Sequence, residues 1–323
     1  MVLVGTTSGD TLVFTVSDEN IYGDTETFLP SPFNTAIRGG NDRINVTGNN
    51  NAIWGDALFF REGIDGTGGR GGNDTIRISG SGNEVFADAQ FSFLSSKSGN
   101  DRVIVFGSGN RAQGDGCFAY DTSRSGDDIV IATGNNNTLT GDNFVGMFDQ
   151  TVAGDDRLRI TGDNGTLLGD SAQLEDSAVG GDDRLRLIGR RGRLFGDAAF
   201  MRDAAQGGDD VLIGGRSRDL LVGDALEMSA DNQGGNDRMR GNGGADTFVI
   251  GEFAGTERIL DFRSGEDKIG LIGGLRFTQL ELRGNRIRYQ GSVLAILSGV
   301  DATTLNRGDF RTVAPLDGIG DLL

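Results

Sequence analysis

The sequence predicts an all-β fold: a right-handed parallel β-solenoid (a β-roll or β-helix) of about nine coils, closed by a C-terminal β cap. Three observations predict it. An aspartate recurs at a nearly constant spacing of about 27 residues, and a second aspartate follows 14 residues after it. Between the two, apolar and polar residues alternate as in a half-buried strand. Such internal repetition is typical of stacked coils.

The first aspartate of each unit anchors the repeat, with successive spacings of 32, 32, 27, 27, 28, 27, 27 and 27 residues. The part after the second aspartate varies in length, as a surface loop does, and it is longest at residues 24–42 and 56–74. The anchors are Asp10, Asp42, Asp74, Asp101, Asp128, Asp156, Asp183, Asp210 and Asp237; the second aspartates are Asp24, Asp56, Asp88, Asp115, Asp142, Asp170, Asp197 and Asp224.

Each unit contains three apolar segments separated by turns. The first segment has apolar residues two and four positions after the anchor, such as Ile44 and Val46. A turn rich in Gly and Asn leads to a second segment, and a Gly-Asp turn leads to a third. We therefore expect three short strands per coil. The second strand lies around Ile53, Val85, Leu139, Leu167, Leu194 and Leu221, and the third around Phe60, Phe91, Phe118, Phe144 and Phe200.

The composition excludes several classes of function. A net charge of −17 disfavours nucleic acid, which requires a basic surface that displaces counterions. The chain has no histidine and one cysteine, Cys117, which excludes an internal disulfide, a Cys/His zinc site and a His-dependent triad. Departures from the repeat lie in loop lengths and add no acid–base cluster. We therefore predict that the protein is not an enzyme.

The two aspartate series become two columns of carboxylates when the coils stack at about 4.8 Å. Two carboxylates at this separation repel each other by about 1 kcal/mol in water and by several times more near protein. Cations, protons or hydrogen-bond donors must therefore compensate them. Only oxygen ligands are present, which favours Ca²⁺ over transition metals. In the alternative interpretation, Asp and Asn only favour the turn conformations.

Two further aspartates carry a resemblance to a known family. Asp219 in GGRSRD and Asp246 in GNGGAD each follow an anchor by nine residues. These segments resemble the nonapeptide GGxGxDxUx of RTX (repeats-in-toxin) calcium-binding proteins, which implies Ca²⁺ at turns between coils. The resemblance is closest at residues 207–250. The predicted calcium ligands are Asp42, Asp56, Asp74, Asp88, Asp101, Asp115, Asp128, Asp142, Asp156, Asp170, Asp183, Asp197, Asp210, Asp219, Asp224, Asp237 and Asp246.

Upstream turns carry a different residue at the position of Asp219. We expect the asparagines there to stack coil on coil through their amides instead of binding calcium. The residues at this position are Asn51, Asn83, Asn110 and Asn137, then Gly165 and Gly192.

The repeat weakens near Gly251, which divides the chain into predicted repeats at 1–250 and a cap at 251–323. The second region, with ILDF and GEDKI, resembles the cap that follows RTX repeats, and in that family this region carries the type I secretion signal. The sequence shows neither a Sec signal peptide nor an apolar run of about 18 residues that could span a bilayer. The resemblance therefore implies a secreted or cell-surface protein.

A stripe of arginines lies beside the anchors. We expect these side chains to pair with nearby carboxylates; in the alternative, they bind a cell-surface or matrix polysaccharide. The predicted function is a secreted calcium-binding repeat protein with a structural, surface or adhesive role that folds on calcium after export. The alternative is an extracellular polysaccharide-binding or polysaccharide-modifying module, and self-association remains an option for either. The stripe comprises Arg43, Arg77, Arg102, Arg157, Arg159, Arg184, Arg186, Arg238 and Arg240.

Overall fold

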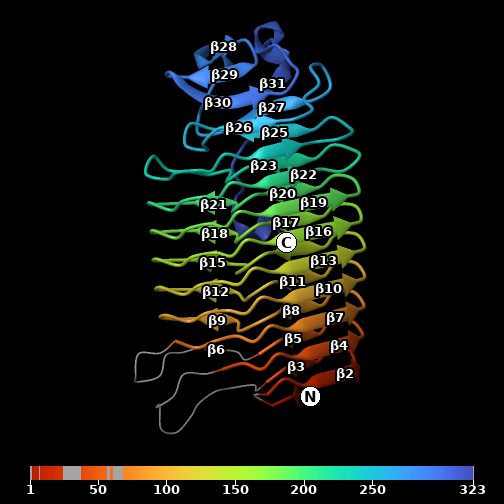
Figure 1. Cartoon of the computed structure of the whole chain (residues 1–323). Helices are drawn as coiled ribbons and strands as arrows, with labels where there is room; N and C mark the ends of the chain where they lie inside the picture. Colours follow the sequence, from red (N-terminus) through yellow and green to blue (C-terminus); the bar gives the residue numbers. More distant parts are fainter. Residues whose placement is uncertain (1, 7, 25–37, 57–58, 61–67, 323) are drawn as a thin grey trace.

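The chain forms a tall stack of coils with a cap at its C-terminal end, as the computed structural model shows (Figure 1). The structure describes residues 2–6, 8–24, 38–56, 59–60 and 68–322. Two long sheets of mainly parallel strands run the length of the stack, and a shorter parallel sheet flanks its middle coils, one for each segment of the repeat. This confirms the predicted parallel β-solenoid. The two predicted long loops lie mostly outside the described residues, which leave out 25–37, 57–58 and 61–67. No helix in the described ranges is long and apolar enough to cross a membrane.

The sheet formed by the first segment has 13 strands, of which the last two are antiparallel. In spatial order they are β2 (Thr11–Thr15), β4 (Arg43–Thr47), β7 (Thr75–Ser79), β10 (Arg102–Phe106), β13 (Ile129–Thr133), β16 (Arg157–Thr161), β19 (Arg184–Ile188), β22 (Val211–Ile213), β24 (Arg238–Arg240), β26 (Glu257–Ile259), β30 (Ser292–Leu297), β29 (Arg286–Tyr289) and β28 (Glu281–Arg283).

The second segment forms a 12-stranded sheet, and the third segment forms a six-stranded one. The 12 strands are β1 (Val2–Val4), β3 (Asn20–Tyr22), β5 (Ala52–Trp54), β8 (Glu84–Phe86), β11 (Arg111–Gln113), β14 (Thr138–Thr140), β17 (Thr166–Leu168), β20 (Arg193–Phe195), β23 (Leu220–Val222), β25 (Thr247–Ile250), β27 (Lys268–Leu271) and β31 (Phe310–Thr312). The six are β6 (Phe59–Phe60), β9 (Phe91–Ser92), β12 (Phe118–Ala119), β15 (Gly146–Met147), β18 (Gln173–Leu174) and β21 (Phe200–Met201).

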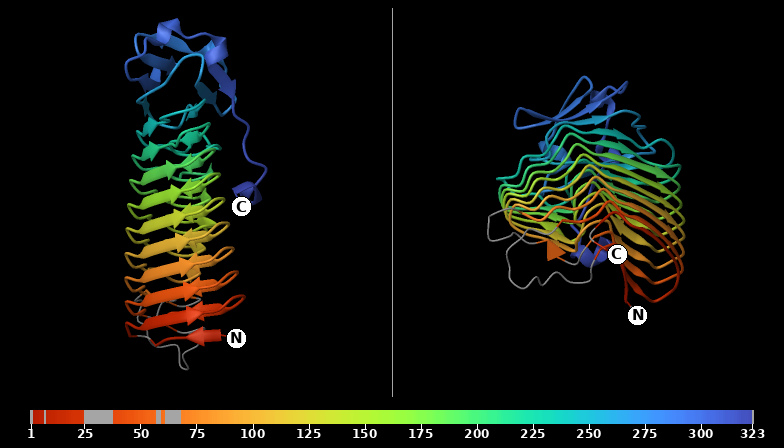
Figure 2. Two further views of the ribbon diagram at one scale, coloured as in Figure 1. Left: turned by 90° about the vertical axis from the view of Figure 1, so that its right-hand side faces the viewer. Right: turned by 60° about the horizontal axis from the view of Figure 1, so that its bottom comes forward.

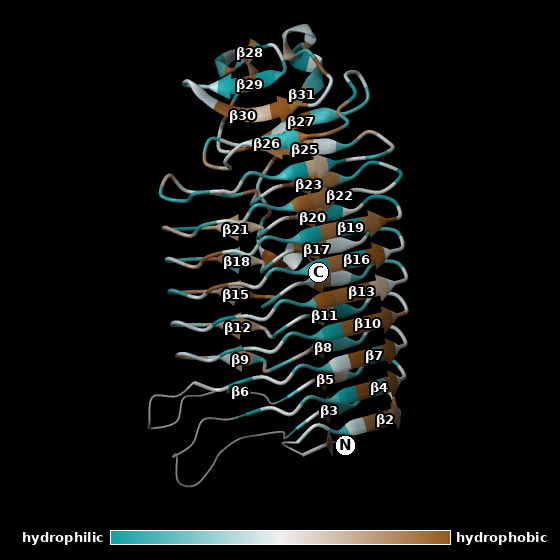
Figure 3. Cartoon of the chain, viewed as in Figure 1, coloured by the Kyte–Doolittle hydropathy of each residue, from teal (hydrophilic) through white to brown (hydrophobic). Residues whose placement is uncertain are grey.

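The main core lies between the two long sheets and follows from the alternation in the sequence. The strand register places the same residue type at equivalent positions of neighbouring coils: Ile44 pairs with Ile76, and Leu158 pairs with Leu185. These side chains are fully buried or nearly so, whereas the residues between them face outward. Figure 3 shows apolar residues recurring at the same place in strand after strand. One coil could not bury this surface alone, so the coils stabilise one another by stacking.

Aromatic rings stack along the arm formed by the third segment. Phe93, Tyr120 and Phe148 follow one another at centroid separations of 5.3 and 5.1 Å, and Phe91 stacks on Phe118 at 5.4 Å. The ring planes are within 15° of parallel, so the faces are turned toward one another along the stack. Stacking therefore accounts for these residues as packing within the solenoid.

Asparagines form a ladder at the turn between the first and second strands, which confirms the predicted stacking. The side-chain oxygen of Asn110 accepts hydrogen bonds from the backbone N–H of Asn83, at 2.9 Å, and from its side-chain amide, at 3.1 Å. Asn110 in turn donates both kinds of bond to Asn137. An amide carries both donors and an acceptor, so a column of amides satisfies itself without any ion.

Both long sheets continue past residue 250 into the C-terminal region. β26, β27, β30 and β31 extend them, and the hairpin of β28 and β29 closes the end. Short 3-10 helices link these strands: η1 (Phe277–Gln279), η2 (Ala302–Thr304) and η3 (Arg307–Asp309). The final segment runs back along the stack (Figure 2) and ends in η4 (Ile319–Leu322), where Leu322 is fully buried among Leu168, Phe195 and other apolar side chains.

Replacing Asn110 by Ala tests the amide ladder. The change leaves the buried backbone N–H of Asn83 without an acceptor and removes one of the two acceptors of its side-chain amide, which keeps the carbonyl of Gly48. An unsatisfied buried donor costs about 1–3 kcal/mol. We expect the free energy of unfolding to fall by roughly 2–4 kcal/mol in chemical denaturation. Asn285→Ala is the control, because Asn285 is exposed. Equal stability of the two variants would show that the ladder does not stabilise the fold.

Candidate metal site

The anchor aspartates form one continuous buried column at the start of the first strands. The backbone N–H of each anchor donates to Oδ1 of the anchor in the next coil: Asp42 to Asp74 at 2.7 Å, and Asp101 to Asp128 at 2.6 Å. This bond fixes the carboxylate and leaves Oδ2 buried with no hydrogen-bond partner. The same oxygen is unpartnered in Asp42, Asp74, Asp101, Asp128, Asp156, Asp183, Asp210 and Asp237.

The second aspartates form a parallel column that faces the first. Each typically accepts a backbone N–H from the turn that leads into the next anchor, as Asp56 does from Gly72 at 2.9 Å and Asp197 from Gly208 at 2.7 Å. Except in Asp142, whose two oxygens share the N–H of Gly154, one oxygen again has no partner, and in Asp115 neither oxygen has one. These side chains are at most 1 % exposed. The two columns therefore present buried, unpaired carboxylate oxygens.

A glycine precedes every second aspartate except Asp88, which follows Ala87, and it makes room for the anchor carboxylate. A Cβ at Gly141 would lie 1.8 Å from Oδ2 of Asp156, and one at Gly169 would lie 1.9 Å from Oδ2 of Asp183. At these two glycines no side chain fits in the space. The Gly-Asp pair of the repeat therefore serves both columns: its glycine admits one carboxylate, and its aspartate supplies the other.

The columns meet in groups of three carboxylates whose oxygens all lie within 4.8 Å of one another. Each of the four all-aspartate groups joins a second aspartate, the anchor of the next coil and the second aspartate of that coil; the fifth has Glu257 as its third member. In the described chain the groups are Asp24/Asp42/Asp56, Asp56/Asp74/Asp88, Asp88/Asp101/Asp115, Asp115/Asp128/Asp142 and Asp224/Asp237/Glu257. Asp156, Asp170, Asp183, Asp197 and Asp210 continue both columns without forming a described triad this close.

Glu257 completes the last triad and was not found from the sequence. Strand β26 pairs Arg258 with Arg238, so Glu257 takes the anchor position after Asp237. It is 0 % exposed, and both carboxylate oxygens are unpartnered. The signal was present in the sequence as Glu-Arg at 257–258 in place of the usual Asp-Arg. The spacing of 20 residues from Asp237, instead of 27, concealed it.

No cationic side chain compensates these carboxylates: within the described residues, no arginine or lysine lies within 4.0 Å of either column. Burial therefore raises the pKa of Asp42 and of Asp237 to about 7 each. For Asp128 and Asp156, burial and then the neighbouring carboxylates raise the pKa well above its ordinary value. The columns require protons or cations at neutral pH.

Asp219 and Asp246, the residues of the RTX-like turns, lie in a different column. They continue the asparagine ladder: Gly192 donates to Asp219 at 2.7 Å, Asp219 donates to Asp246 at 2.9 Å, and Asp246 donates to Asp267 at 3.0 Å. Both oxygens of Asp219 accept backbone N–H groups, the second from Gly215. Neither aspartate belongs to a described triad, so a calcium role for them remains a prediction. The other predicted ligands all lie in the two facing columns.

The arginine stripe lies on the outer face of the 13-stranded sheet, and all nine side chains are exposed. The ion pairs expected for them are almost absent within the described residues. Only Arg240 approaches a carboxylate, that of Asp261 at 3.9 Å. Arg77 lies instead over the ring of Phe106. A shallow hollow of about 220 Å³ separates Ile129 and Ile131 from the arginines of β16 and β19.

Comparison with known proteins adds no family assignment: no protein-family model and no curated protein matches this chain. Any function must therefore be argued from the site itself.

The raised pKa values predict how pH affects the ion-free protein. The folded state binds more protons than the unfolded state between about pH 4, the ordinary aspartate range, and about pH 7, so stability falls as pH rises through this window. Without divalent ions, we expect the unfolding temperature at pH 5 to exceed that at pH 8 by roughly 10 °C or more.

Thermal unfolding followed by circular dichroism checks this. Asp237→Asn is expected to reduce the pH dependence because it removes one of the groups that titrate. An unfolding temperature that rises from pH 5 to pH 8 would contradict the assignment of raised pKa values to the columns.

Proposed function

We propose that this chain is a calcium-binding repeat protein whose coils stack around divalent cations held between the two aspartate columns. The observation that carries the proposal is the charge of the triads. In the run from Asp24 to Asp142, each of the two interior triads has one anchor of its own and shares its two other aspartates with neighbouring triads. An unshared carboxylate counts as one negative charge, and each shared carboxylate counts as one half. An interior triad therefore carries two negative charges, which matches the charge of one divalent cation.

The donor set also suits calcium. Each triad offers buried carboxylate oxygens with no other partner, and Ca²⁺ takes six to eight oxygen ligands from carboxylates and backbone carbonyls. Histidine is absent from the chain, and Cys117 belongs to no triad, so softer metals find no preferred ligand. A bound ion would neutralise charges that otherwise repel across successive coils.

Calcium would then act as part of the fold. Without the ion, the carboxylates resist burial unless they are protonated; with it, burial becomes favourable, so binding free energy becomes folding free energy. This supports a protein that stays open where calcium is scarce and closes where calcium is abundant. We propose a structural, surface or adhesive role for it outside the cell, and no catalytic one.

Export is the part of the proposal that depends on the RTX-like C-terminal region. We expect the full-length protein to reach the medium of a cell with a type I exporter, and a variant lacking residues 251–323 to remain inside. Immunoblots of medium and cell fractions measure this. Equal export of both forms would refute a secretion signal in this region.

A calcium titration tests the ion proposal directly. Far-UV circular dichroism at pH 7.5 should show a cooperative gain of β signal with Ca²⁺ and not with Mg²⁺. Asp115→Asn should weaken this response, because Asp115 belongs to two triads and both of its oxygens lack partners. Losing one site costs about 2.7 kcal/mol of stability at a calcium concentration 100 times its dissociation constant.

Asp209→Asn is the matched control. Asp209 has the same charge, but it is exposed and lies in the turn outside the columns. A complete β spectrum without calcium, unchanged by adding it and equal in both variants, would leave the solenoid in place and refute calcium-dependent folding.

A further inference from the structure

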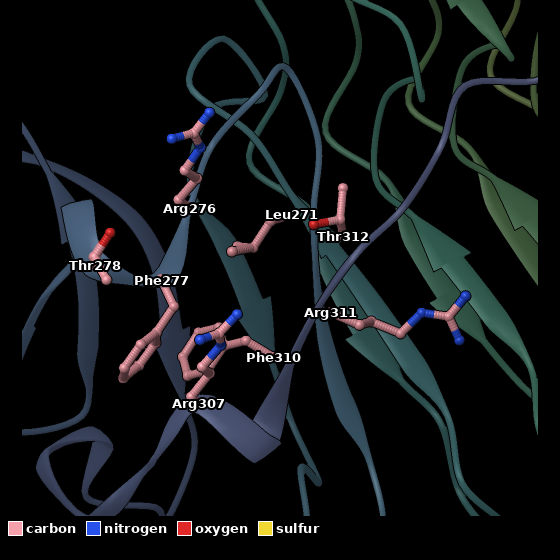
Figure 4. A pocket seen from close by; sticks show the side chains of 8 residues that line it. All are labelled: Leu271, Arg276, Phe277, Thr278, Arg307, Phe310, Arg311 and Thr312. Carbon is pink, nitrogen blue, oxygen red and sulfur yellow. The ribbon is translucent and has the colours of Figure 1, made fainter.

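A cavity of about 490 Å³ opens beside the cap, at the last strand of the 12-stranded sheet. Arg276, Arg307 and Arg311 line it together with Phe277 and Phe310. The two rings lie 4.9 Å apart between centroids and are tilted by 47°. Figure 4 shows Arg311 pointing away from the two rings, whereas Arg307 lies beside them.

A second hollow of about 320 Å³ adjoins the first through Arg311, which lines both. Arg191 and Arg218 lie in its wall, with Thr247 and Val313. We call the two cavities together the cap groove. It crosses the edge strand β31 and extends onto the last coils of the solenoid.

The cap groove concentrates positive charge on a chain whose net charge is −17. Six arginines line it, of which Arg193 is half-buried and donates to Thr166. The other five are exposed: Arg191, Arg218, Arg276, Arg307 and Arg311. In the described parts of the chain, none of them has a carboxylate oxygen within 4.0 Å.

The acidic residues nearby are already engaged. Both oxygens of Asp219, in the wall of the second hollow, accept backbone N–H groups. Asp309, next to Phe310, is held by Asn306 and Ser264. The guanidinium groups are therefore available to a ligand.

We propose that the cap groove binds an anionic polysaccharide, carboxylated or sulfated. Guanidinium groups form bidentate, charge-assisted hydrogen bonds with carboxylates and comparable oxyanions. The rings of Phe277 and Phe310 offer apolar surface to the C–H faces of sugar rings, and the hydroxyls of Thr278 and Thr312 offer hydrogen bonds. Apolar walls with a few convergent polar groups are typical of ligand sites.

Other anionic partners fit the groove less well. A nucleic acid duplex would meet the field of a strongly acidic chain beyond the groove. The arginine stripe on the 13-stranded sheet is similarly charged, but its hollow is smaller and has no aromatic ring in its wall. The stripe therefore provides a matched control for charge alone.

Isothermal titration calorimetry of the full-length protein with hexagalacturonate, a heparin hexasaccharide and neutral maltohexaose tests the proposal. We expect one or both acidic sugars to bind, more weakly at higher salt, and the neutral sugar not to bind. Arg276→Gln/Arg307→Gln/Arg311→Gln should weaken binding at least tenfold, because the loss of a single charge-assisted hydrogen bond already lowers affinity by about that factor.

The control variant Arg157→Gln/Arg159→Gln/Arg184→Gln removes the same charge from the stripe and should bind the sugar as the unmodified protein does. Circular dichroism verifies that both variants keep the fold. Absence of binding, equal weakening in both variants, or tighter binding of a short DNA duplex would overturn the proposal. A further result would also overturn it: concentration-dependent self-association in the absence of sugar, measured by analytical ultracentrifugation, that only the cap-groove variant abolishes. The assay reports on the groove of the folded protein, so its failure is distinguishable from failure of calcium-dependent folding.

Discussion

The constraint on which this structure depends is that parallel stacking turns every repeated residue into a column. A residue that faces inward in one coil faces the same residue in the next, about 4.8 Å away. For Ile and Leu this is favourable because apolar surface is buried on both sides. For a carboxylate it is costly, since each buried charge adds to the repulsion of its neighbours. The repeat carries two such columns, so the fold must include whatever neutralises them.

The chain meets this constraint in three chemically distinct ways. The column at Asn83 and Asn110 uses amides, which donate and accept and therefore complete their own hydrogen bonds. The turn column at Asp155 and Asp182 keeps its carboxylates exposed, where water screens them while they cap backbone N–H groups. Apart from the aspartates that end the asparagine column, only the two facing columns in the described chain are acceptor-only and buried. In most of their members one carboxylate oxygen remains unpartnered, because the protein supplies one donor for two oxygens. This arrangement requires protons or cations.

Much of the fold was predictable because the repeat fixes which residues stack. The strands around Ile44 and Ile53 and the amide ladder followed from alternation and spacing alone. The sequence could not show which columns face each other, since that depends on how far each turn rotates the chain. The spacing places Asp219 at the turn position of the asparagines, and it does stack in that column, but spacing alone could not show that this column stands apart from the two facing ones. Glu257 was missed for a related reason: a shortened coil preserves the stacking position while it destroys the spacing.

Sharing of carboxylates makes the occupancy of adjacent sites interdependent. Asp88 belongs to two triads, so an ion in one of them draws on charge that the other also uses. With a cation in both triads, Asp88 would be balanced between the two ions. With the triad of Asp88, Asp101 and Asp115 empty, Asp101 would face the two neighbouring carboxylates with no cation to compensate their repulsion. If cations occupy these triads as proposed, partial filling of the run from Asp24 to Asp142 is unfavourable, and the ions would bind together as the coils close. The triad at Asp224, Asp237 and Glu257 stands apart from this run. It shares no residue with the other triads, so an ion there would bind independently, and it lies next to the strands that lead into the cap.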